Sequence, residues 1–144
     1  MRKILVMDDE RDALFYYRAW MGANAGSDNE DAIEIIACAS IPAARQAVAE
    51  RISASKEGNG GPRFDLCLLD FKVPGDTSGL DFARELVDLG IRSNNIILIT
   101  AGEKPNIIDI GLQYTPKPIN EFELKKILIN NGFGVRDVPR KLSL

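Results

Sequence analysis

Three aspartates, a threonine and a lysine are candidates for a reactive site because each stands at or just after the end of a predicted strand. Asp8 and Asp9 follow the first apolar run, and Asp70 closes a run shortly before a Val-Pro-Gly segment. Thr100 ends a later apolar run, and Lys117 follows a short segment over 113–116. Carboxylates, a hydroxyl and an ammonium group that meet in space can hold a metal ion and a tetrahedral anion between them. These residue types therefore predict phosphoryl transfer onto a carboxylate, provided that the fold gathers them.

The three acids need a cation if they lie close together. Two carboxylates about 4 Å apart repel by roughly 4 kcal/mol at an effective dielectric near 20. A ligand set of carboxylates and backbone carbonyls suits Mg²⁺, with Lys117 as a fixed positive charge opposite the metal. The alternatives are that Asp70 only opens a turn, that Asp8 and Asp9 favour the start of a helix, and that Lys117 is a solvated surface residue.

The composition fits one soluble globular domain and limits the function classes. The chain has 144 residues with 18 Lys and Arg against 21 Asp and Glu, and its net charge of −3 gives no electrostatic basis for binding nucleic acid. It has no histidine, so it cannot supply a phosphohistidine or a histidine-based triad. No apolar stretch approaches the roughly 18 residues of a membrane span, so we expect no membrane insertion and a cytoplasmic location. Cys38 and Cys67 fall in apolar runs and are expected to be buried free thiols.

Strand and helix patterns alternate along the chain. Short apolar runs predict strands over 3–7, 33–39, 66–70 and 95–100, and a brief fifth strand is predicted over 113–115. A 3.6-residue apolar period predicts helices over 10–21, 41–52, 78–90 and 120–132, with Ile52 and Phe122 among their inward positions. The segment 102–112 has room only for a short helix, and the polar, glycine-bearing segments 22–31 and 53–63 are predicted to be loops.

This alternation predicts an α/β fold of three layers, a doubly wound parallel sheet of five strands with five helices, the fourth short. In such a sheet all strands end at the same edge, where ligands bind. The five candidate residues are therefore expected to meet although they are spread over most of the chain. We expect one domain over 1–132 and a C-terminal tail without clear structure over 133–144.

The combined pattern resembles the receiver domain of two-component response regulators. The resemblance rests on Asp8-Asp9, on Asp70 with Pro74 four residues later, on Thr100-Ala101 and on Lys117-Pro118. It implies a flavodoxin-like sheet with strand order 2-1-3-4-5. It also implies a stand-alone signalling protein rather than an enzyme, one that catalyses only its own phosphorylation and dephosphorylation.

The resemblance implies a role for each site residue. Asp70 would be the phosphoacceptor, and Asp9 and Asp70 would bind Mg²⁺ together with the backbone carbonyl of Lys72. Asp8 would act through a metal-bound water. Thr100 and Lys117 would contact the phosphoryl oxygens, and the Lys117-Pro118 bond is often cis in such domains.

A switch and a set of partners are implied as well. Tyr114 matches an aromatic position that turns inward as the threonine moves, so Thr100 and Tyr114 would form a two-state switch. The alternative for Tyr114 is a half-buried packing residue. The implied phosphoryl donor is a histidine kinase or a histidine phosphotransfer protein. An unidentified protein would be the downstream target, and a homodimer is a further option.

Two other functions stay open. A degenerate receiver would act as a phosphorylation-independent interaction module; the acidic cluster argues against it and the shortened fourth helix argues for it. An aspartyl-type phosphohydrolase would want a second Asp two residues after a nucleophile on the first strand, where this chain has Asp8-Asp9-Glu10.

The chain departs from the receiver pattern in two places. Thr100 and Tyr114 are close in sequence, which leaves little room for a fourth helix and alters the usual signalling face. Lys72 stands two residues after Asp70, and we hypothesise that it changes the lifetime of the aspartyl phosphate by restricting in-line water. An unchanged dephosphorylation rate in Lys72→Ala would contradict this hypothesis.

Overall fold

The computed structural model describes residues 2–25, 32–54, 64–102 and 111–135, and its strands form one parallel sheet. The strand order is β2-β1-β3-β4-β5, which confirms the predicted order. Every neighbouring pair is parallel, so the carboxyl ends of all strands lie along one edge. The strands are β1 (Arg2–Met7), β2 (Ile33–Cys38), β3 (Leu66–Asp70), β4 (Ile96–Thr100) and β5 (Gln113–Pro116).

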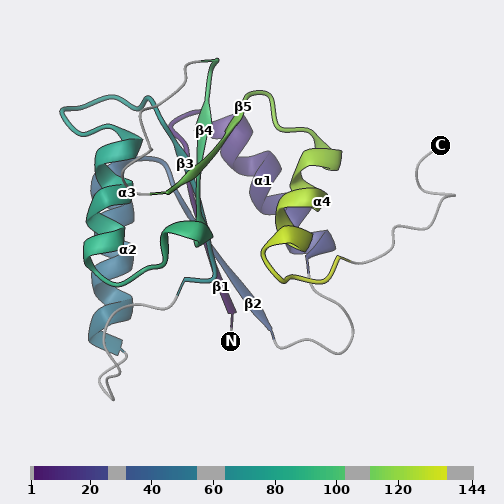
Figure 1. The fold of residues 1–144 in the computed structure, drawn as a ribbon, viewed down its shortest axis with the longest axis horizontal. Coiled ribbons are helices and arrows are strands. Elements are labelled where there is room, and N and C mark those ends of the chain that lie inside the picture. The colour runs from purple at the N-terminus through teal and green to yellow at the C-terminus, as the bar shows by residue number, and fades with distance from the viewer. Residues whose placement is uncertain (1, 26–31, 55–63, 103–110, 136–144) are drawn as a thin grey trace, which may run out of the picture.

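Helices cover both faces of this sheet and produce the three-layer arrangement (Figure 1). α1 and α4 pack on one face, and α2 and α3 pack on the other. The short helix predicted within 102–112 falls mostly on residues 103–110, which lie outside the described residues. In the part of the chain that the structure describes, no helix combines the length and the apolar character that crossing a bilayer requires. The helices are α1 (Arg11–Asn24), α2 (Ile41–Ala54), α3 (Gly79–Asp88) and α4 (Glu121–Asn130), with a 3-10 turn at Ser93–Asn95.

The central strands are apolar at nearly every position because both of their faces are buried. In β3, Cys67 and Leu69 belong to the core under α2 and α3, whereas Leu66 and Leu68 belong to the core under α1 and α4. All four side chains are fully buried, which is worth roughly 1.5–3 kcal/mol for each large apolar one. β1 alternates between the two cores in the same way. Cys67 and Cys38 are buried free thiols, as expected.

Several predicted boundaries are wrong by one to three residues. α1 continues to Asn24, beyond the loop predicted from Gly22, and Asn24 Nδ2 donates a hydrogen bond to Trp20 O at 2.9 Å in the last turn. α2 likewise runs on to Ala54, and β4 begins only at Ile96 because the residues before it form the 3-10 turn.

Two apolar residues that were expected to face the core are exposed. Ile52 is 38% exposed in the last turn of α2, and Phe122 is 64% exposed near the start of α4. Leu124, Ile127 and Leu128 form the buried stripe of α4. Residues two positions apart on a helix do not share a face, so Phe122 lies away from Leu124 and toward solvent.

The predicted tail begins with residues that pack on the fold, so its boundary at 132 is too early. Phe133 is buried in the core under α1 and α4, and Val135 pairs with Ala25 through an antiparallel bridge. The guanidinium carbon of Arg2 lies 3.7 Å from the centroid of the Phe133 ring, and Arg2 Nη1 donates to Gly132 O at 2.9 Å. These contacts join the first strand to the segment after α4, an interaction between sequence ends that no local pattern signals. Residues 136–144 lie outside the described ranges.

Gly79 marks the closest approach of α3 to the end of β3. Its backbone N–H donates to Phe71 O at 2.8 Å, and a Cβ added to it would collide with the backbone carbonyl oxygen of Asp70. Ser78 and Asp81 form a capping box at the start of the helix. Position 79 therefore needs glycine for space, because α3 packs directly against the strand end that carries Asp70.

Gly79→Ala should lower the free energy of unfolding by about 2–3 kcal/mol, because the added methyl group meets backbone rather than a flexible side chain. Gly22→Ala is the matched control. Gly22 lies in α1 with no other atom within 4 Å of its Cβ position. Alanine in a helix interior should raise stability there by about 0.5–1 kcal/mol. Urea unfolding measures both changes, and a Gly79→Ala protein as stable as the parent would contradict the close approach.

Candidate functional site

The structure brings Asp8, Asp9 and Asp70 together at the carboxyl edge of the sheet. β1 and β3 are neighbours, with Met7 paired to Leu69, so the residues at their ends lie side by side. One carboxylate oxygen from each aspartate lies within 4.8 Å of the other two. Asp8 and Asp70 are buried, whereas Asp9 is exposed. Strand pairing thus converts two distant stretches of sequence into one acidic cluster.

Asp8 offers a carboxylate oxygen that the protein itself does not use fully. Its side chain is 0% exposed, and its Oδ1 accepts a hydrogen bond from the Glu10 N–H at 2.9 Å. Its Oδ2 has no hydrogen-bond partner among the described residues, although Lys117 Nζ lies 3.4 Å away. A buried oxygen without a donor is costly unless a cation or a water reaches it. This oxygen, with two further carboxylates beside it, fits a hard cation such as Mg²⁺, which prefers oxygen ligands.

Lys117 brings positive charge to the cluster from the loop after β5. Its Nζ lies 3.4 Å from Asp70 Oδ2, at the same distance as from Asp8 Oδ2. Its backbone N–H donates to Thr100 O at 2.6 Å, and its peptide bond to Pro118 is cis. The hydrogen bond to Thr100 ties the lysine to the end of β4, next to the strand that carries Asp70.

Glu10 is a site residue that the sequence analysis missed. The shortest contact of Lys117 Nζ with a carboxylate in the described structure is to Glu10 Oε1, at 3.0 Å. Glu10 occupies the N-cap position of α1, and its side chain is 66% exposed. The signal in the sequence is the run Asp8-Asp9-Glu10, whose third acid is typical of a helix start. Only the position of the loop after β5 shows that it contacts Lys117.

Three other predicted residues lie on β4, on β5 and in the segment after β3. Thr100 ends β4 and is 1% exposed, and its Oγ1 accepts a long hydrogen bond of 3.5 Å from the Gly102 N–H. Tyr114 lies on β5 and is 38% exposed. Lys72 is exposed in the segment that follows Asp70. The phosphoryl contact of Thr100, the switching role of Tyr114 and the metal-binding carbonyl of Lys72 stay predictions.

Burial and charge shift the titration of the central groups. Burial raises the pKa of Asp70 to about 7, with the negative charge of Asp8 and a hydrogen bond with Asp9 adding to the rise, while Lys117 opposes it. Burial lowers the pKa of Lys117, but the hydrogen bond to Glu10 and the charges of Asp8 and Asp70 outweigh burial and raise it overall. Without a metal ion, Asp70 is therefore partly protonated near neutral pH and Lys117 is charged.

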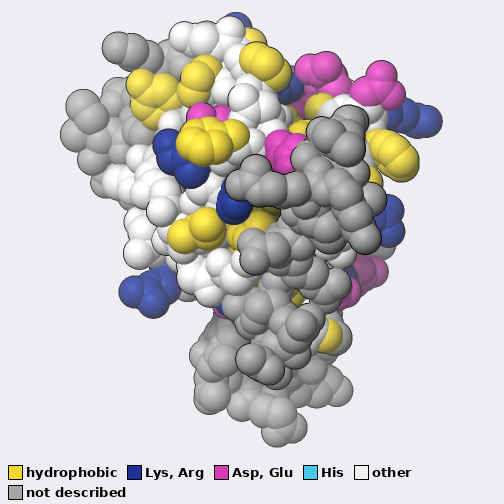
Figure 2. All heavy atoms as spheres, turned by 90° about the vertical axis from the view of Figure 1, so that its right-hand side faces the viewer, with side chains coloured by type: hydrophobic (Ala, Val, Ile, Leu, Met, Phe, Trp, Pro, Cys, Tyr) yellow, Lys and Arg dark blue, Asp and Glu magenta, His cyan; other side chains and the backbone are white. Residues whose placement is uncertain are grey.

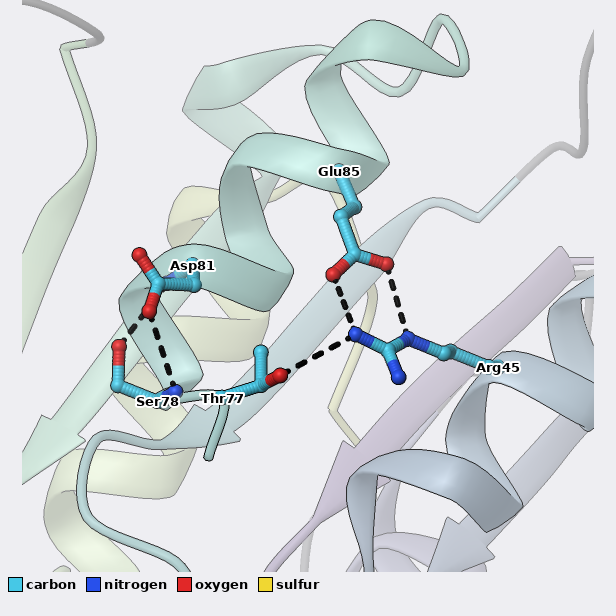
Figure 3. Close-up of polar contacts among 5 residues, drawn as sticks. All are labelled: Arg45, Thr77, Ser78, Asp81 and Glu85. Carbon is cyan, nitrogen blue, oxygen red and sulfur yellow. Dashed lines mark hydrogen bonds and ion pairs between the residues drawn. The ribbon is translucent and has the colours of Figure 1, made fainter. Parts of the chain in front are cut away.

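The segment between Asp70 and α3 is held in place by contacts to two helices. Arg45 of α2 binds Glu85 of α3 through two hydrogen bonds, of 2.7 and 3.0 Å, and reaches Thr77 Oγ1 at 3.3 Å (Figure 3). Ser78 and Asp81 close the start of α3 beside them (Figure 3). The segment that would supply the Lys72 carbonyl thus has one end fixed at β3 and the other at α3.

A surface pocket of about 530 Å³ opens beside Lys117. Burial and then the charge of Asp8 raise the pKa of Tyr17 in its wall to about 12, so this tyrosine is neutral. On the neighbouring surface of α1 and α4, exposed apolar side chains stand among charged ones (Figure 2), and Phe15 is 71% exposed. The lining residues are Glu10, Asp12, Ala13, Tyr16, Tyr17, Ala101, Lys117, Pro118 and Ile119.

Solved structures of similar shape identify the fold. No family model matches the sequence, and no curated protein sequence does either. A response regulator receiver domain protein from Clostridium thermocellum is 23% identical with a TM-score of 0.67, over 91% of this chain and 94% of that one. The receiver domain of the histidine kinase CKI1 from Arabidopsis thaliana, complexed with Mg²⁺ and BeF₃⁻, is 20% identical with a TM-score of 0.63, over 88% and 89%. The response regulator TrrA from Thermotoga maritima, in complex with Mg²⁺ and beryllofluoride, is 23% identical with a TM-score of 0.61, over 91% and 99%. At such identities the likeness establishes the receiver-domain fold, and the site chemistry has to be argued from this chain's own residues.

The metal-free protein should lose stability as the pH rises from about 4 to 8. The pKa of Asp70 is higher in the folded protein, at about 7, than the value of about 4 in an unfolded chain, so the unfolded state releases this proton first. The stabilisation that belongs to the neutral carboxyl is present below about pH 4 and is lost as the pH passes through about 7. The difference of about three between these two pKa values predicts a loss on the order of 4 kcal/mol, measured by urea unfolding in buffer with a chelator.

Asp70→Asn removes this titration and should be more stable than the parent at pH 8. Asp76→Asn, at an exposed acid in the segment after β3, is the control and should keep the pH dependence of the parent. Equal slopes of stability against pH in the parent and in Asp70→Asn would show that Asp70 is not the group responsible.

Proposed function

We propose that this chain, which has the receiver-domain fold, is a signalling receiver that accepts a phosphoryl group on Asp70 and changes its protein contacts in response. The observation that supports this function best is the position of Asp70 inside a cluster of three aspartates, with Lys117 Nζ 3.4 Å from its Oδ2. A carboxylate that serves only to cap a turn has no need of two further acids and a lysine. Perturbed acids gathered at one edge of a sheet are typical of a reactive site.

The transfer itself needs an ionised Asp70. One carboxylate oxygen forms a bond to phosphorus while the bond from phosphorus to an imidazole nitrogen of the donor breaks. The imidazole leaves with the electron pair of that bond, and a proton on its other ring nitrogen makes the leaving group a neutral imidazole. Because this chain has no histidine, the donor imidazole belongs to another protein, which supports a histidine kinase or a histidine phosphotransfer protein as the partner.

The residues around Asp70 prepare it for this step. Mg²⁺, when bound, supplies positive charge that ionises Asp70 and offsets the charge of the phosphoryl oxygens. Asp9 and Asp70 would hold it with the Lys72 carbonyl, and Asp8 would act through a water. Two of the similar structures hold Mg²⁺ with beryllofluoride, a mimic of the phosphoryl group, which supports this choice of metal.

Lys117 and Thr100 would bind the phosphoryl oxygens. Thr100 follows Ile99, the residue that pairs with Asp70 in the sheet, so its hydroxyl is one strand away from the acceptor. Its present hydrogen bond to the Gly102 N–H is long and inexpensive to give up. A turn of Thr100 toward the phosphoryl group would alter the neighbouring strand β5, where exposed Tyr114 has room to move. The two residues would thereby report phosphorylation to a downstream protein.

A phosphorylation-independent interaction module is the competing function. The exposed aromatic side chains Phe15 and Phe122 favour it, because they offer apolar contact area whether or not Asp70 is modified. Uptake of a phosphoryl group separates the two functions.

Incubation of the parent protein with acetyl phosphate and Mg²⁺ should add one phosphoryl group, detected by intact mass. Asp70→Asn should gain none, because its amide lacks the nucleophilic carboxylate. Removal of Mg²⁺ with a chelator should abolish uptake in the parent.

Asp76→Asn is the matched control, since it removes an exposed acid from the segment that follows β3 and should be phosphorylated like the parent. An adduct of equal size in the parent and in Asp70→Asn would remove Asp70 from the acceptor role. The absence of any adduct in the parent would instead favour the interaction module.

A further inference from the structure

Of the three acids within ion-pair distance of Lys117, Glu10 lies closest to its Nζ. Lys117 Nζ lies 3.0 Å from Glu10 Oε1, compared with 3.4 Å from Asp70 Oδ2 and 3.4 Å from Asp8 Oδ2. An ammonium group has three N–H donors, and three acids of the described structure lie within ion-pair distance of this one. A fourth anion that arrives beside Asp70 can bind Lys117 well only if one of the three gives way.

The three acids differ in what they lose when the lysine turns away. The side chain of Asp8 is 0% exposed and that of Asp70 is 6% exposed, so a loss of the lysine would leave a buried charge unpaired. The side chain of Glu10 is 66% exposed, and water replaces the lysine there at little cost. Glu10 is therefore the partner that an incoming anion displaces.

We propose that Glu10 is a positioning residue that occupies one donor of Lys117 in the resting protein and thereby opposes the binding of a phosphoryl group beside Asp70. This inference rests on the proposed function, because Lys117 meets a phosphoryl group only if Asp70 accepts one. Two effects of Glu10 act in the same direction. Its ion pair with Lys117 has to be given up, and its negative charge repels a group that itself carries about two negative charges. Glu10 thus sets how easily the phosphorylated state is reached.

Asp12 provides the matched comparison. It lies in the first turn of α1, is exposed, and lines the same pocket as Glu10. The carboxylates found in ion pairs with Lys117 in the described structure are those of Asp8, Glu10 and Asp70, and Asp12 is not among them. Glu10→Gln and Asp12→Asn therefore remove the same charge from the same rim, but only the first removes an ion-pair partner of Lys117.

Beryllofluoride binding at saturating Mg²⁺ tests the proposal without any phosphoryl donor. Glu10→Gln should bind beryllofluoride about 3- to 10-fold more tightly than the parent, as expected for the loss of one exposed ion pair and one nearby like charge, and Asp12→Asn should stay within about two-fold of the parent. Mg²⁺ alone should bind Glu10→Gln as well as the parent or more weakly, because one negative charge is gone. A variant that was merely misfolded would bind both ligands more weakly, so tighter beryllofluoride binding distinguishes the positioning role.

A second readout needs no metal. In metal-free protein the NMR signals of the Lys117 side-chain Cε and its protons should shift in Glu10→Gln and stay in place in Asp12→Asn, because only the first variant changes what Nζ contacts. The absence of a shift in Glu10→Gln would show that Glu10 does not hold Lys117 in solution.

The outcomes separate this inference from the proposed function. If the parent fails to bind beryllofluoride in the presence of Mg²⁺, the proposed function fails. If the parent binds it and Glu10→Gln binds it no more tightly, the proposed function stands and the role of Glu10 is overturned. Equal gains in Glu10→Gln and Asp12→Asn would also overturn it, because the effect would then come from overall charge rather than from the release of Lys117.

Discussion

The crowding of carboxylates around one ammonium group is the constraint on which the site depends. Asp8 and Asp70 are buried side by side, and their mutual repulsion and loss of water would oppose folding if no positive charge were near. Lys117 supplies that charge and still leaves Asp8 Oδ2 without a hydrogen-bond partner in the described structure. The acidic cluster therefore carries excess negative charge, which a divalent cation would offset. Such a cluster favours the binding of a cation, because the added positive charge reduces the repulsion between its carboxylates.

The two hydrophobic cores stabilise the fold against the repulsion within the acidic cluster. β1 and β3 are buried on both faces, so the strand ends that carry Asp8 and Asp70 are anchored by apolar side chains from each layer. Gly79 lets α3 pack against the end of β3, and the bonds from Arg45 hold the segment that follows. Burial, together with repulsion at the edge, can then raise the pKa of Asp70 without pushing the strands apart. The hydrophobic stabilisation of the sheet offsets the cost of the acidic cluster.

The exposure of the partners of Lys117 divides the site into a fixed part and a part that can change. Asp8 and Asp70 are buried and belong to neighbouring strands, so their positions follow from the sheet. Glu10 is mostly exposed at the start of α1, at the rim of the pocket beside Lys117. Breaking the ion pair of Lys117 with exposed Glu10 costs less than breaking its ion pairs with buried Asp8 and Asp70, because water solvates the carboxylate of Glu10 afterwards. This difference in exposure would let Lys117 keep its contacts with the buried acids, which stabilise the fold, and exchange Glu10 for a phosphoryl oxygen in the proposed reaction.

The fold class, the order of the strands and the common edge that carries Asp8, Asp9, Asp70, Thr100 and Lys117 could be predicted from the sequence. These features follow from the alternation of strand and helix patterns and from the connectivity of a parallel sheet. Three features are visible only in the folded chain: Glu10 pairs with Lys117, Asp8 Oδ2 has no hydrogen-bond partner among the described residues, and Phe133 packs under Arg2. The tertiary structure also exposes Phe122, although an apolar residue in a helix is expected to face the core. These features arise from distances between segments far apart in the chain, and a sequence pattern carries no information on which of several acids a lysine side chain will reach.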